Sequence, residues 1–340
     1  MVMKAAIKPR INMKERTKLE EVIPLDTPFI LTVSPASACN LKCAFCPTGD
    51  RHLMRSTDRF MGLMEYSLFT KIIDDLEYFP QKIKVLMLVN DGEPFLNKNL
   101  DSMVRYAKRS NNVPFIETTT NGILMTSDRV GGLIDAGIDK INISIYGMDS
   151  ATYKDFAKSD VDFDIILANI KWLYENKGNT EIVIKIPKEL LATNATVENF
   201  YEMFGDYCDR VFVENSSQMW PDFDVSKRMN VDFTEGLWGH QIEEKLVCPN
   251  IFYALTINAN GEVSACYVDW ARALLVGDVK VQNLNEIWNS KEFNNLRIQH
   301  LSGNRNKNLV CKKCNQPQHC SLDNLDPYKD ELLTKLVNKI

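Results

Sequence analysis

The stretch SPASACNLKCAFCPTGD, residues 34–50, decides the fold and the chemistry of this 340-residue chain, because it places Cys39, Cys43 and Cys46 in a C-x3-C-x2-C pattern. The apolar, β-branched run FILTVSPAS (29–37) leads into it, so the cysteines lie in the loop at the carboxyl end of an expected strand. Three thiolates this close suit three irons of one iron–sulfur cubane. No fourth cysteine lies in this stretch, and an iron without a protein ligand keeps the open position of a reactive metal site. The alternative, a zinc site, would leave the ion one ligand short.

Strand and helix signals alternate regularly from residue 29 to about residue 217. Five further apolar runs follow the first, at 84–90, 114–122, 140–147, 181–187 and 210–216. Helical patterns fill the intervals, at 65–77, 99–109, 126–136, 149–158, 162–176 and 196–207. Six β/α repeats with near-continuous apolar strands predict an α/β fold with a parallel sheet covered by helices. Six units are too few for a closed eight-stranded barrel, so we expect a partial (β/α)6 barrel or an open doubly wound sheet. In both, function lies at the carboxyl ends of the strands.

The pattern changes after residue 217. A connector at 218–247 precedes two strands within 252–268, which the hairpin signal Asn260-Gly261 joins. Helices are expected at 283–300 and near 325–339. The expected organisation is an N-terminal extension (1–28), the partial barrel (29–217), the connector (218–247), a small β-hairpin and helix domain (248–320) and a C-terminal helix (321–340).

The C-terminal part carries a second group of cysteines. Four of them form the pattern C-x17-C-x44-C-x2-C, namely Cys248, Cys266, Cys311 and Cys314. A C-x2-C pair is common in zinc-stapled small domains, which is one explanation of this set. Cys320 follows as a fifth member, and the isolated Cys208 is expected to fill the core.

Composition and charge exclude several classes of protein. Hydrophobic residues make up 45% and charged residues 25%, as in ordinary globular domains. The net charge of −5 leaves no basic footprint for a nucleic acid. The first 28 residues contain no apolar run, so neither a signal peptide nor a membrane anchor is expected. We therefore expect a cytoplasmic protein without a nucleic-acid or membrane partner. A reducing compartment disfavours disulfides, so the nine cysteines indicate metal binding.

The first cysteine group resembles the cluster motif of the radical S-adenosylmethionine (SAM) superfamily, including the aromatic Phe45 before its last cysteine. The resemblance implies a [4Fe–4S] cluster on Cys39, Cys43 and Cys46, whose open iron is chelated by the amino and carboxylate groups of SAM. It also implies that the backbone of Phe45 lies near the adenine.

Three segments that follow the second, third and fourth strands also match this family: NDGEP (90–94), TNG (120–122) and ISIYG (143–147). NDGEP is similar to the family's GGEP segment, whose backbone contacts the SAM amino group. The resemblance thus implies a SAM site that includes Gly92, Glu93, Asn121 and Ser144.

Two departures from the family pattern stand out. Asp91 replaces the first glycine of GGEP, which a main-chain contact tolerates. Lys158 stands where many relatives carry an arginine for the SAM carboxylate, and lysine lacks the bidentate fork of arginine. The alternatives for Lys158 are a solvated helix face, or replacement in this role by Lys185.

The second cysteine group resembles the SPASM/twitch auxiliary-cluster domain of radical SAM enzymes. With five cysteines in place of the seven of a two-cluster domain, it is similar to the twitch type, which implies one auxiliary [4Fe–4S] cluster. The spacing is similar to that of the 2-deoxy-scyllo-inosamine dehydrogenases, which oxidise an aminocyclitol. The cofactors implied are therefore SAM and two [4Fe–4S] clusters, with a reductant such as flavodoxin or ferredoxin as partner.

These resemblances imply that a SAM-derived 5′-deoxyadenosyl radical abstracts hydrogen from a substrate held at the carboxyl ends of the strands. The leading hypothesis is an oxidoreductase, either a dehydrogenase or an epimerase, that acts on a sugar or aminocyclitol. Oxidation needs a base, for which Glu214 and Lys185 are candidates by position. Epimerisation needs a hydrogen donor, a role open to Cys320, which alternatively is a cluster ligand or an inert thiol.

Two other functions are kept as alternatives. One is a maturase that modifies a ribosomal peptide or a protein side chain. The first barrel strand begins at residue 29, and the short segment before it argues mildly against a peptide-recognition domain there. The other is a scaffold that binds iron–sulfur or zinc without catalysis, which turnover of SAM would separate from both enzymes.

Overall fold

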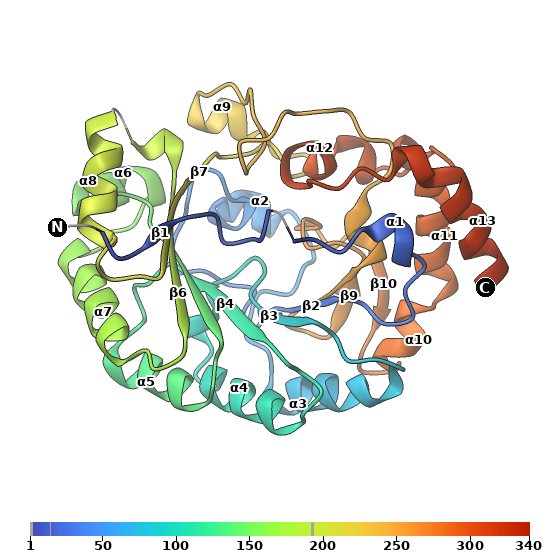
Figure 1. The fold of residues 1–340 in the computed structure, drawn as a ribbon, viewed down its shortest axis with the longest axis horizontal. Helices are drawn as coiled ribbons and strands as arrows, with labels where there is room; N and C mark the ends of the chain where they lie inside the picture. The colour runs from blue at the N-terminus through green and yellow to red at the C-terminus, as the bar shows by residue number, and fades with distance from the viewer. Residues whose placement is uncertain (1–2, 14, 192–193) are drawn as a thin grey trace.

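The computed structural model describes residues 3–13, 15–191 and 194–340, and Figure 1 shows its fold. Residues 1, 2 and 14 of the expected N-terminal extension and residues 192–193 of the expected barrel lie outside the described residues.

The six predicted strands are present and form the centre of one open sheet, in which each is parallel to its neighbours. They are β2 (Ile30–Val33), β3 (Val85–Leu88), β4 (Ile116–Thr120), β5 (Lys140–Ser144), β6 (Glu181–Pro187) and β7 (Arg210–Glu214). The sheet curves without closing, so the expected partial barrel is confirmed.

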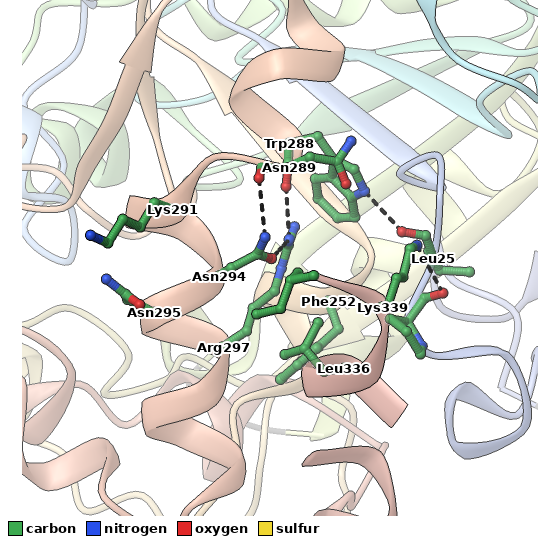
Figure 2. A pocket seen from close by; sticks show the side chains of 12 residues that line it. Leu25, Phe252, Trp288, Asn289, Lys291, Asn294, Asn295, Arg297, Leu336 and Lys339 are labelled. Atoms are coloured by element: carbon green, nitrogen blue, oxygen red, sulfur yellow. Dashed lines mark hydrogen bonds between the residues drawn. The ribbon is translucent and has the colours of Figure 1, made fainter. Parts of the chain in front are cut away.

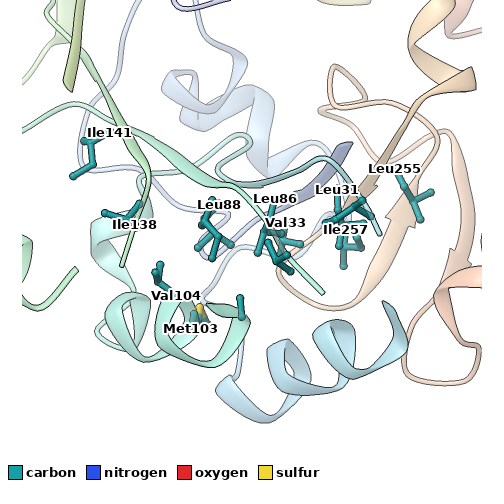
Figure 3. Packing of buried hydrophobic residues seen from close by; sticks show 14 of the residues in the cluster. Leu31, Val33, Leu86, Leu88, Met103, Val104, Ile138, Ile141, Leu255 and Ile257 are labelled. Atoms are coloured by element: carbon teal, nitrogen blue, oxygen red, sulfur yellow. The ribbon is translucent and has the colours of Figure 1, made fainter. Parts of the chain in front are cut away.

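Alternate positions along these strands face opposite sides of the sheet. Leu31, Leu86 and Ile141 face the helices, and their side chains are fully buried. Figure 3 shows this layer packed against Met103 and Val104 of α4 (Leu100–Arg109). Burial of each such side chain contributes about 1.5–3 kcal/mol, which explains why the strands are nearly continuous apolar runs.

The opposite face of the sheet, the inner wall of the barrel, carries many polar side chains among apolar ones such as Met87, Val183 and Phe212. The registers of the parallel ladders place these residues on it: Thr32, Glu117, Lys140, Asn142, Ser144, Lys185 and Glu214. A polar wall inside an otherwise apolar sheet needs a function to explain it, because burying polar groups without partners costs free energy.

Helices cover the outer face of the sheet (Figure 1). Besides α4 they are α3 (Tyr66–Asp74), α5 (Ser127–Asp135), α6 (Ser150–Ala157), α7 (Phe163–Asn176) and α8 (Asn194–Phe204). Shorter helices are α1 (Leu19–Val22), α2 (Arg51–Arg55), α9 (Val225–Met229), α10 (Leu284–Trp288) and α12 (Gln316–Cys320). Longer C-terminal ones are α11 (Lys291–Leu301) and α13 (Lys329–Lys339).

Single 3-10 turns complete the helical structure. They are η1 (Pro47–Gly49), η2 (Asp75–Tyr78), η3 (Pro94–Leu96), η4 (Lys188–Leu190), η5 (Pro249–Phe252), η6 (Arg305–Lys307), η7 (Cys311–Lys313) and η8 (Asp326–Tyr328).

The sheet extends beyond the six strands at both edges. At one edge β1 (Ala6–Ile7) pairs in parallel with β7. At the other edge β8 (Ala254–Ile257) pairs in parallel with β2, and β9 (Glu262–Ser264) and β10 (Leu275–Asp278) follow antiparallel. The predicted Asn260-Gly261 hairpin therefore continues the sheet of the barrel.

Two helix predictions were wrong in detail. The helix expected at 283–300 is two helices, because Ser290 caps α11 by accepting a hydrogen bond from the Phe293 amide at 3.2 Å. The last helix begins at Lys329 and not near 325, since Pro327 favours the preceding 3-10 turn.

Candidate functional site

The first cysteine group lies in the loop after β2, at the carboxyl edge of the sheet. Burial raises the pKa of the Cys39 thiol to about 12. Burial also raises the pKa of Cys43, and the nearby Cys46 and Cys39 thiols add to this shift by charge repulsion. The Leu41 amide donates to Sγ of Cys39 at 3.5 Å. Three neighbouring thiols, of which Cys43 is buried and Cys39 and Cys46 are half-buried, fit a cationic iron cluster, which would hold them as thiolates.

The predicted SAM segment after β3 packs directly on this loop. A Cβ atom at Gly92 would lie 2.1 Å from the carbonyl oxygen of Ala36 and 2.6 Å from that of Ala38. The Glu93 amide donates to the same Ala38 oxygen at 2.9 Å. Glycine is therefore required here by the close approach of two backbones.

The buried Glu93 carboxylate ties the ends of two strands together. It accepts hydrogen bonds from the Thr120 hydroxyl at 2.7 Å, from the Asn121 amide at 2.8 Å and from the Phe95 amide at 3.1 Å. Burial raises its pKa, and the hydrogen bonds oppose this shift. Glu93 thus holds the loops after β3 and β4 in position, whereas a contact of its own with SAM stays a prediction.

Phe45 belongs to the cysteine loop, Asn121 contacts that loop, and Ser144 ends β5. The Asn121 side-chain amide donates to Oδ1 of Asn40 at 2.8 Å and lies 4.0 Å from Sγ of Cys39. The Phe45 ring packs on Phe156 with 5.6 Å between the ring centroids. Ser144 lies buried at the end of β5, on the polar wall. The segment after β4 thus contacts the cysteine loop, whereas contacts of Phe45 and Ser144 with SAM stay predictions.

Lys158 lies at the end of α6 in the left-handed conformation, with φ of 48°. Its side chain is 60% exposed and pairs with Asp155 at 3.3 Å. Its two neighbours contact the cysteine loop: the Ala157 carbonyl accepts from the Lys42 amide at 2.9 Å, and the Ser159 hydroxyl donates to the Asn40 carbonyl at 3.4 Å. The backbone of this segment therefore belongs to the site, and binding of the SAM carboxylate by Lys158 stays a prediction.

The four cysteines of the second pattern line one cavity: Cys248, Cys266, Cys311 and Cys314. Burial raises the pKa of all four thiols, to about 11 for Cys248. The Asn250 side-chain amide donates to Sγ of Cys266 at 3.3 Å. Arg305 also lines the cavity and donates to the carbonyls of Cys311 and Cys314 at 2.6 and 3.0 Å. Four buried thiols and a guanidinium around one cavity fit an anionic thiolate-bound cluster.

Cys320 is not among the residues that line this cavity. It lies at the end of α12, with its Sγ 3.3 Å from the Ser217 hydroxyl. Burial raises its pKa to about 12, and the charge of Glu214 contributes to that shift. Glu214 in turn forms an ion pair with Lys185 on the inner wall. Lys185 and Glu214 are thus in contact, and Cys320 lies within the electrostatic influence of Glu214.

An ion-pair network that the sequence did not reveal connects the two cysteine sites. The Asp91 carboxylate pairs with Arg59 and with Arg272, each at 2.5 Å, and all three side chains are buried. Arg272 lies in the loop after Cys266, and the Asp91 carbonyl accepts from the Thr48 hydroxyl at 2.7 Å. The sequence gives one indirect signal of this network. Asp91 replaces the first glycine of the GGEP segment, and a buried aspartate there needs a positively charged partner.

A cavity of about 610 Å³ lies elsewhere, between the segment at residues 24–25 and helices α10, α11 and α13 (Figure 2). None of the predicted site residues lines it. Its buried Arg297 donates to the carbonyls of Ile251 and Trp288 at 3.1 and 2.7 Å and so holds the junction of α10 and α11.

Among the described residues, no group of three or more His, Cys, Asp or Glu is placed to hold a single metal ion. In the same part of the chain, no helix is long and apolar enough to cross a membrane.

Two thiol-lined sites joined to one open parallel sheet define the class of protein, a two-cluster iron–sulfur enzyme. A family model described as the radical SAM superfamily matches residues 33–198, and one described as the SPASM iron–sulfur cluster-binding domain matches residues 248–315. The chain belongs to the radical SAM superfamily and carries a SPASM domain. This combination implies SAM and two [4Fe–4S] clusters as cofactors.

Curated relatives share only part of their length with this chain. A probable GTP 3′,8-cyclase of Methanococcus maripaludis is 34% identical over 127 residues, which are 37% of this chain and 38% of that protein. The tungsten-containing aldehyde ferredoxin oxidoreductase cofactor-modifying protein of Pyrococcus furiosus is 32% identical over 109 residues, 32% of this chain and 28% of that protein.

Solved structures share the fold over most of the chain. BtrN in complex with AdoMet and 2-DOIA is 18% identical with a TM-score of 0.56, covering 88% of this chain and 97% of that one. SuiB of Streptococcus suis bound to the precursor peptide SuiA is 16% identical with a TM-score of 0.61, covering 89% and 73%. The similarity to the 2-DOIA dehydrogenase BtrN is thereby confirmed for the fold.

Proposed function

We propose that this radical SAM enzyme abstracts hydrogen from a small polar molecule, a sugar or aminocyclitol, inside the partial barrel, and thereby oxidises or epimerises it. The observation that carries this proposal is the inner wall. There Lys185, which lies opposite Ser144 in the β5–β6 ladder, pairs with Glu214, and the charge of Glu214 acts on the Cys320 thiol. A substrate rich in hydroxyl groups matches such a wall, because each buried polar group then finds a hydrogen-bond partner.

Cys39, Cys43 and Cys46 would hold one cluster, and the four cavity-lining cysteines would hold the other. With SAM, these cofactors supply the hydrogen-abstracting radical and an acceptor for one electron. The remaining steps fall to side chains of the wall. In an oxidation, the Glu214 carboxylate takes the hydroxyl proton, while the ammonium of Lys185 orients that carboxylate. In an epimerisation, the Cys320 thiol gives a hydrogen atom to the opposite face of the substrate, and an external reductant and a proton restore the thiol.

Product analysis in deuterated water tests this proposal. Reconstituted enzyme with SAM and dithionite is supplied with a panel of sugars and aminocyclitols. Oxidation gives a product two mass units lighter, which Glu214→Gln abolishes and Cys320→Ala retains. Epimerisation gives a product that carries one deuterium, which Cys320→Ala abolishes. SAM cleavage that no member of the panel stimulates would contradict the proposal.

A second candidate is the modification of a peptide or protein side chain. The observation in its favour is the fold shared with SuiB, which was solved with its precursor peptide. Peptides encoded near the gene, added to the same assay, would give a mass change in the peptide if this candidate holds.

A further inference from the structure

The N-terminal segment after β1 brings a cation to the inner wall of the barrel. Figure 1 shows this dark blue segment crossing the molecule from β1 to α1. On its way, the carbonyl of Arg10 accepts a hydrogen bond from Nζ of Lys140 at 3.1 Å. Lys140 belongs to the first position of β5, so Arg10 lies against the same polar wall.

Arg10 also reaches the candidate catalytic residues. Its guanidinium lies over the ring of Trp238 at 5.3 Å, and the indole N–H of Trp238 donates to the carbonyl of Cys320 at 3.3 Å. The positive charge of Arg10 contributes to lowering the pKa of Lys185, for which burial is the main cause. The guanidinium is therefore linked to Cys320 through Trp238, and its charge acts on Lys185.

The charges around Arg10 are already paired with one another. Lys140 pairs with Glu117 at 2.7 Å, and Lys185 pairs with Glu214. These side chains are only 8–16% exposed, so each ion pair is held on a nearly dry wall. Within residues 3–13, 15–191 and 194–340, Arg10 forms no ion pair, and its buried Nε has no hydrogen-bond partner.

The remaining carboxylate near the end of β6 does not balance Arg10. Glu189 accepts hydrogen bonds from the amide of Ser216 at 3.1 Å and from its hydroxyl at 2.6 Å. It is thereby fixed to the segment after β7. The wall thus carries two ion pairs and one additional cation with donor groups still available.

We propose that Arg10 binds an oxyanion of the substrate, a phosphate or carboxylate group, so that the substrate is an anionic sugar and not an aminocyclitol. This inference rests on the proposed function and narrows its substrate class. A guanidinium presents parallel N–H groups that match the oxygens of a carboxylate or phosphate. A protonated aminocyclitol would instead meet like charge, which is costly where little water screens it.

Binding to the SAM-loaded holoenzyme tests the inference without turnover. Isothermal titration calorimetry compares four probes on one ring: glucose 6-phosphate, glucuronate, glucose and glucosamine. We expect the two anions to bind at least tenfold more tightly than glucose, and glucosamine most weakly. The phosphate and carboxylate arms show which oxyanion fits better.

Variants at position 10 separate recognition from folding. Arg10→Gln should weaken binding of the preferred anion at least tenfold and leave glucose within twofold, whereas Arg10→Lys should recover part of the loss. Lys8→Gln, an exposed site on the same segment, is the charge-matched control and should bind as the wild type does. Unfolding midpoints of all variants show whether the segment stays in place.

Three results would overturn the inference. The first is that glucosamine binds most tightly, and the second is that Arg10→Gln loses affinity equally for charged and neutral probes. The third is that neither anion binds at ten times the concentration used for glucose. The first leaves a sugar-modifying enzyme intact. A preference for peptides in the product assay contradicts the proposed function instead, so the two failures are distinguishable.

Discussion

Asp91 is a single side chain on which two buried arginines depend. Its Oδ2 pairs with both Arg59 and Arg272 at 2.5 Å, while within the described residues its Oδ1 has no hydrogen-bond partner. Breaking a buried ion pair by removing one partner leaves an uncompensated charge, which is more costly than losing a surface pair.

Asp91→Asn should therefore lower the free energy of unfolding by about 3–5 kcal/mol. Denaturant unfolding of the reconstituted protein measures this. The matched control is Asp160→Asn, because Asp160 pairs with Lys154 at 2.7 Å but both side chains are at least 70% exposed. That variant should change stability by less than about 1 kcal/mol. Equal effects of the two substitutions would mean that the network contributes no more than a surface pair.

His300 gives a residue-level prediction for pH. It is fully buried, and burial, with a smaller effect of Arg305, lowers its pKa to about 3. Its Nδ1 accepts a hydrogen bond from the Cys248 amide at 3.3 Å, which an imidazolium could not do. Between this value and the unfolded pKa near 6.5, only the unfolded chain binds the proton. The stabilising contribution is thus complete above about pH 6.5 and decreases as pH falls.

The stability difference between wild type and His300→Gln should therefore shrink by up to about 1.4 kcal/mol per pH unit between pH 6.5 and pH 4.5. Urea unfolding of both proteins over this range measures the difference, and carboxylate titration common to both cancels. The exposed His52→Gln serves as control. A difference that is constant with pH would show that His300 can be protonated in the folded protein.

At this scale the sequence predicted the residues that motifs mark and missed those that only the fold brings together. The sequence marks the cysteines, Gly92 and Asn121 as candidate site residues because their spacing and their places after strands carry the signal. The partners of Asp91 lie 32 positions before it and 181 positions after it, at no fixed spacing. The position of Arg10 likewise depends on β1, a two-residue strand that is too short to show any periodicity in the sequence.

Among elements, the β3–η3 loop approaches the cysteine loop so closely that no Cβ atom fits at Gly92. Gly92→Ala would place a Cβ atom 2.1 Å from the Ala36 carbonyl oxygen, so the two loops must separate. We expect SAM affinity, measured by equilibrium dialysis, to fall at least tenfold and iron content to decrease. Gly132→Ala in α5 is the control, because its Cβ would meet nothing closer than 3.6 Å and alanine favours a helix by roughly 0.5–1 kcal/mol. Unchanged SAM binding in Gly92→Ala would show that these loops tolerate separation.

Periodicity predicted the six central strands because each is a buried, nearly continuous apolar run. It could not predict the edges. β10 includes Gly277 and Asp278, which are poor strand formers, and is held by its ladder with β9. The parallel pairing of β8 with β2 joins segments more than 200 residues apart, which no local pattern specifies.

For the whole molecule, this pairing means that the barrel and the SPASM region share one sheet, with the Asp91 network as a second connection. The two cofactor sites are nevertheless lined by separate cysteines. Their chemistry should therefore be separable even though their folding is not, which makes the removal of one cluster at a time informative.

Wild-type protein should hold about eight irons, four in each cluster. Cys266→Ala with Cys314→Ala should keep about four irons and still form 5′-deoxyadenosine from SAM, yet make no product, because the cavity has lost two of its four thiols. Replacing Cys39, Cys43 and Cys46 by alanine should also leave about four irons but abolish SAM cleavage. Cys208→Ala, at a fully buried thiol outside both groups, controls for the loss of a core cysteine and should keep all irons and activity.

Circular dichroism and unfolding midpoints must first show that each variant is folded, since Cys266 is followed by the loop that carries Arg272. Iron analysis and Mössbauer spectroscopy then identify which cluster remains. Tightly bound zinc at the second site would replace the auxiliary cluster by the zinc alternative. A folded Cys266→Ala, Cys314→Ala protein with normal product formation would show that the electron leaves the substrate by another route. In that case the Cys320 thiol, which lies outside the cavity and whose pKa the charge of Glu214 helps to raise, would become the group on which the outcome of the reaction depends.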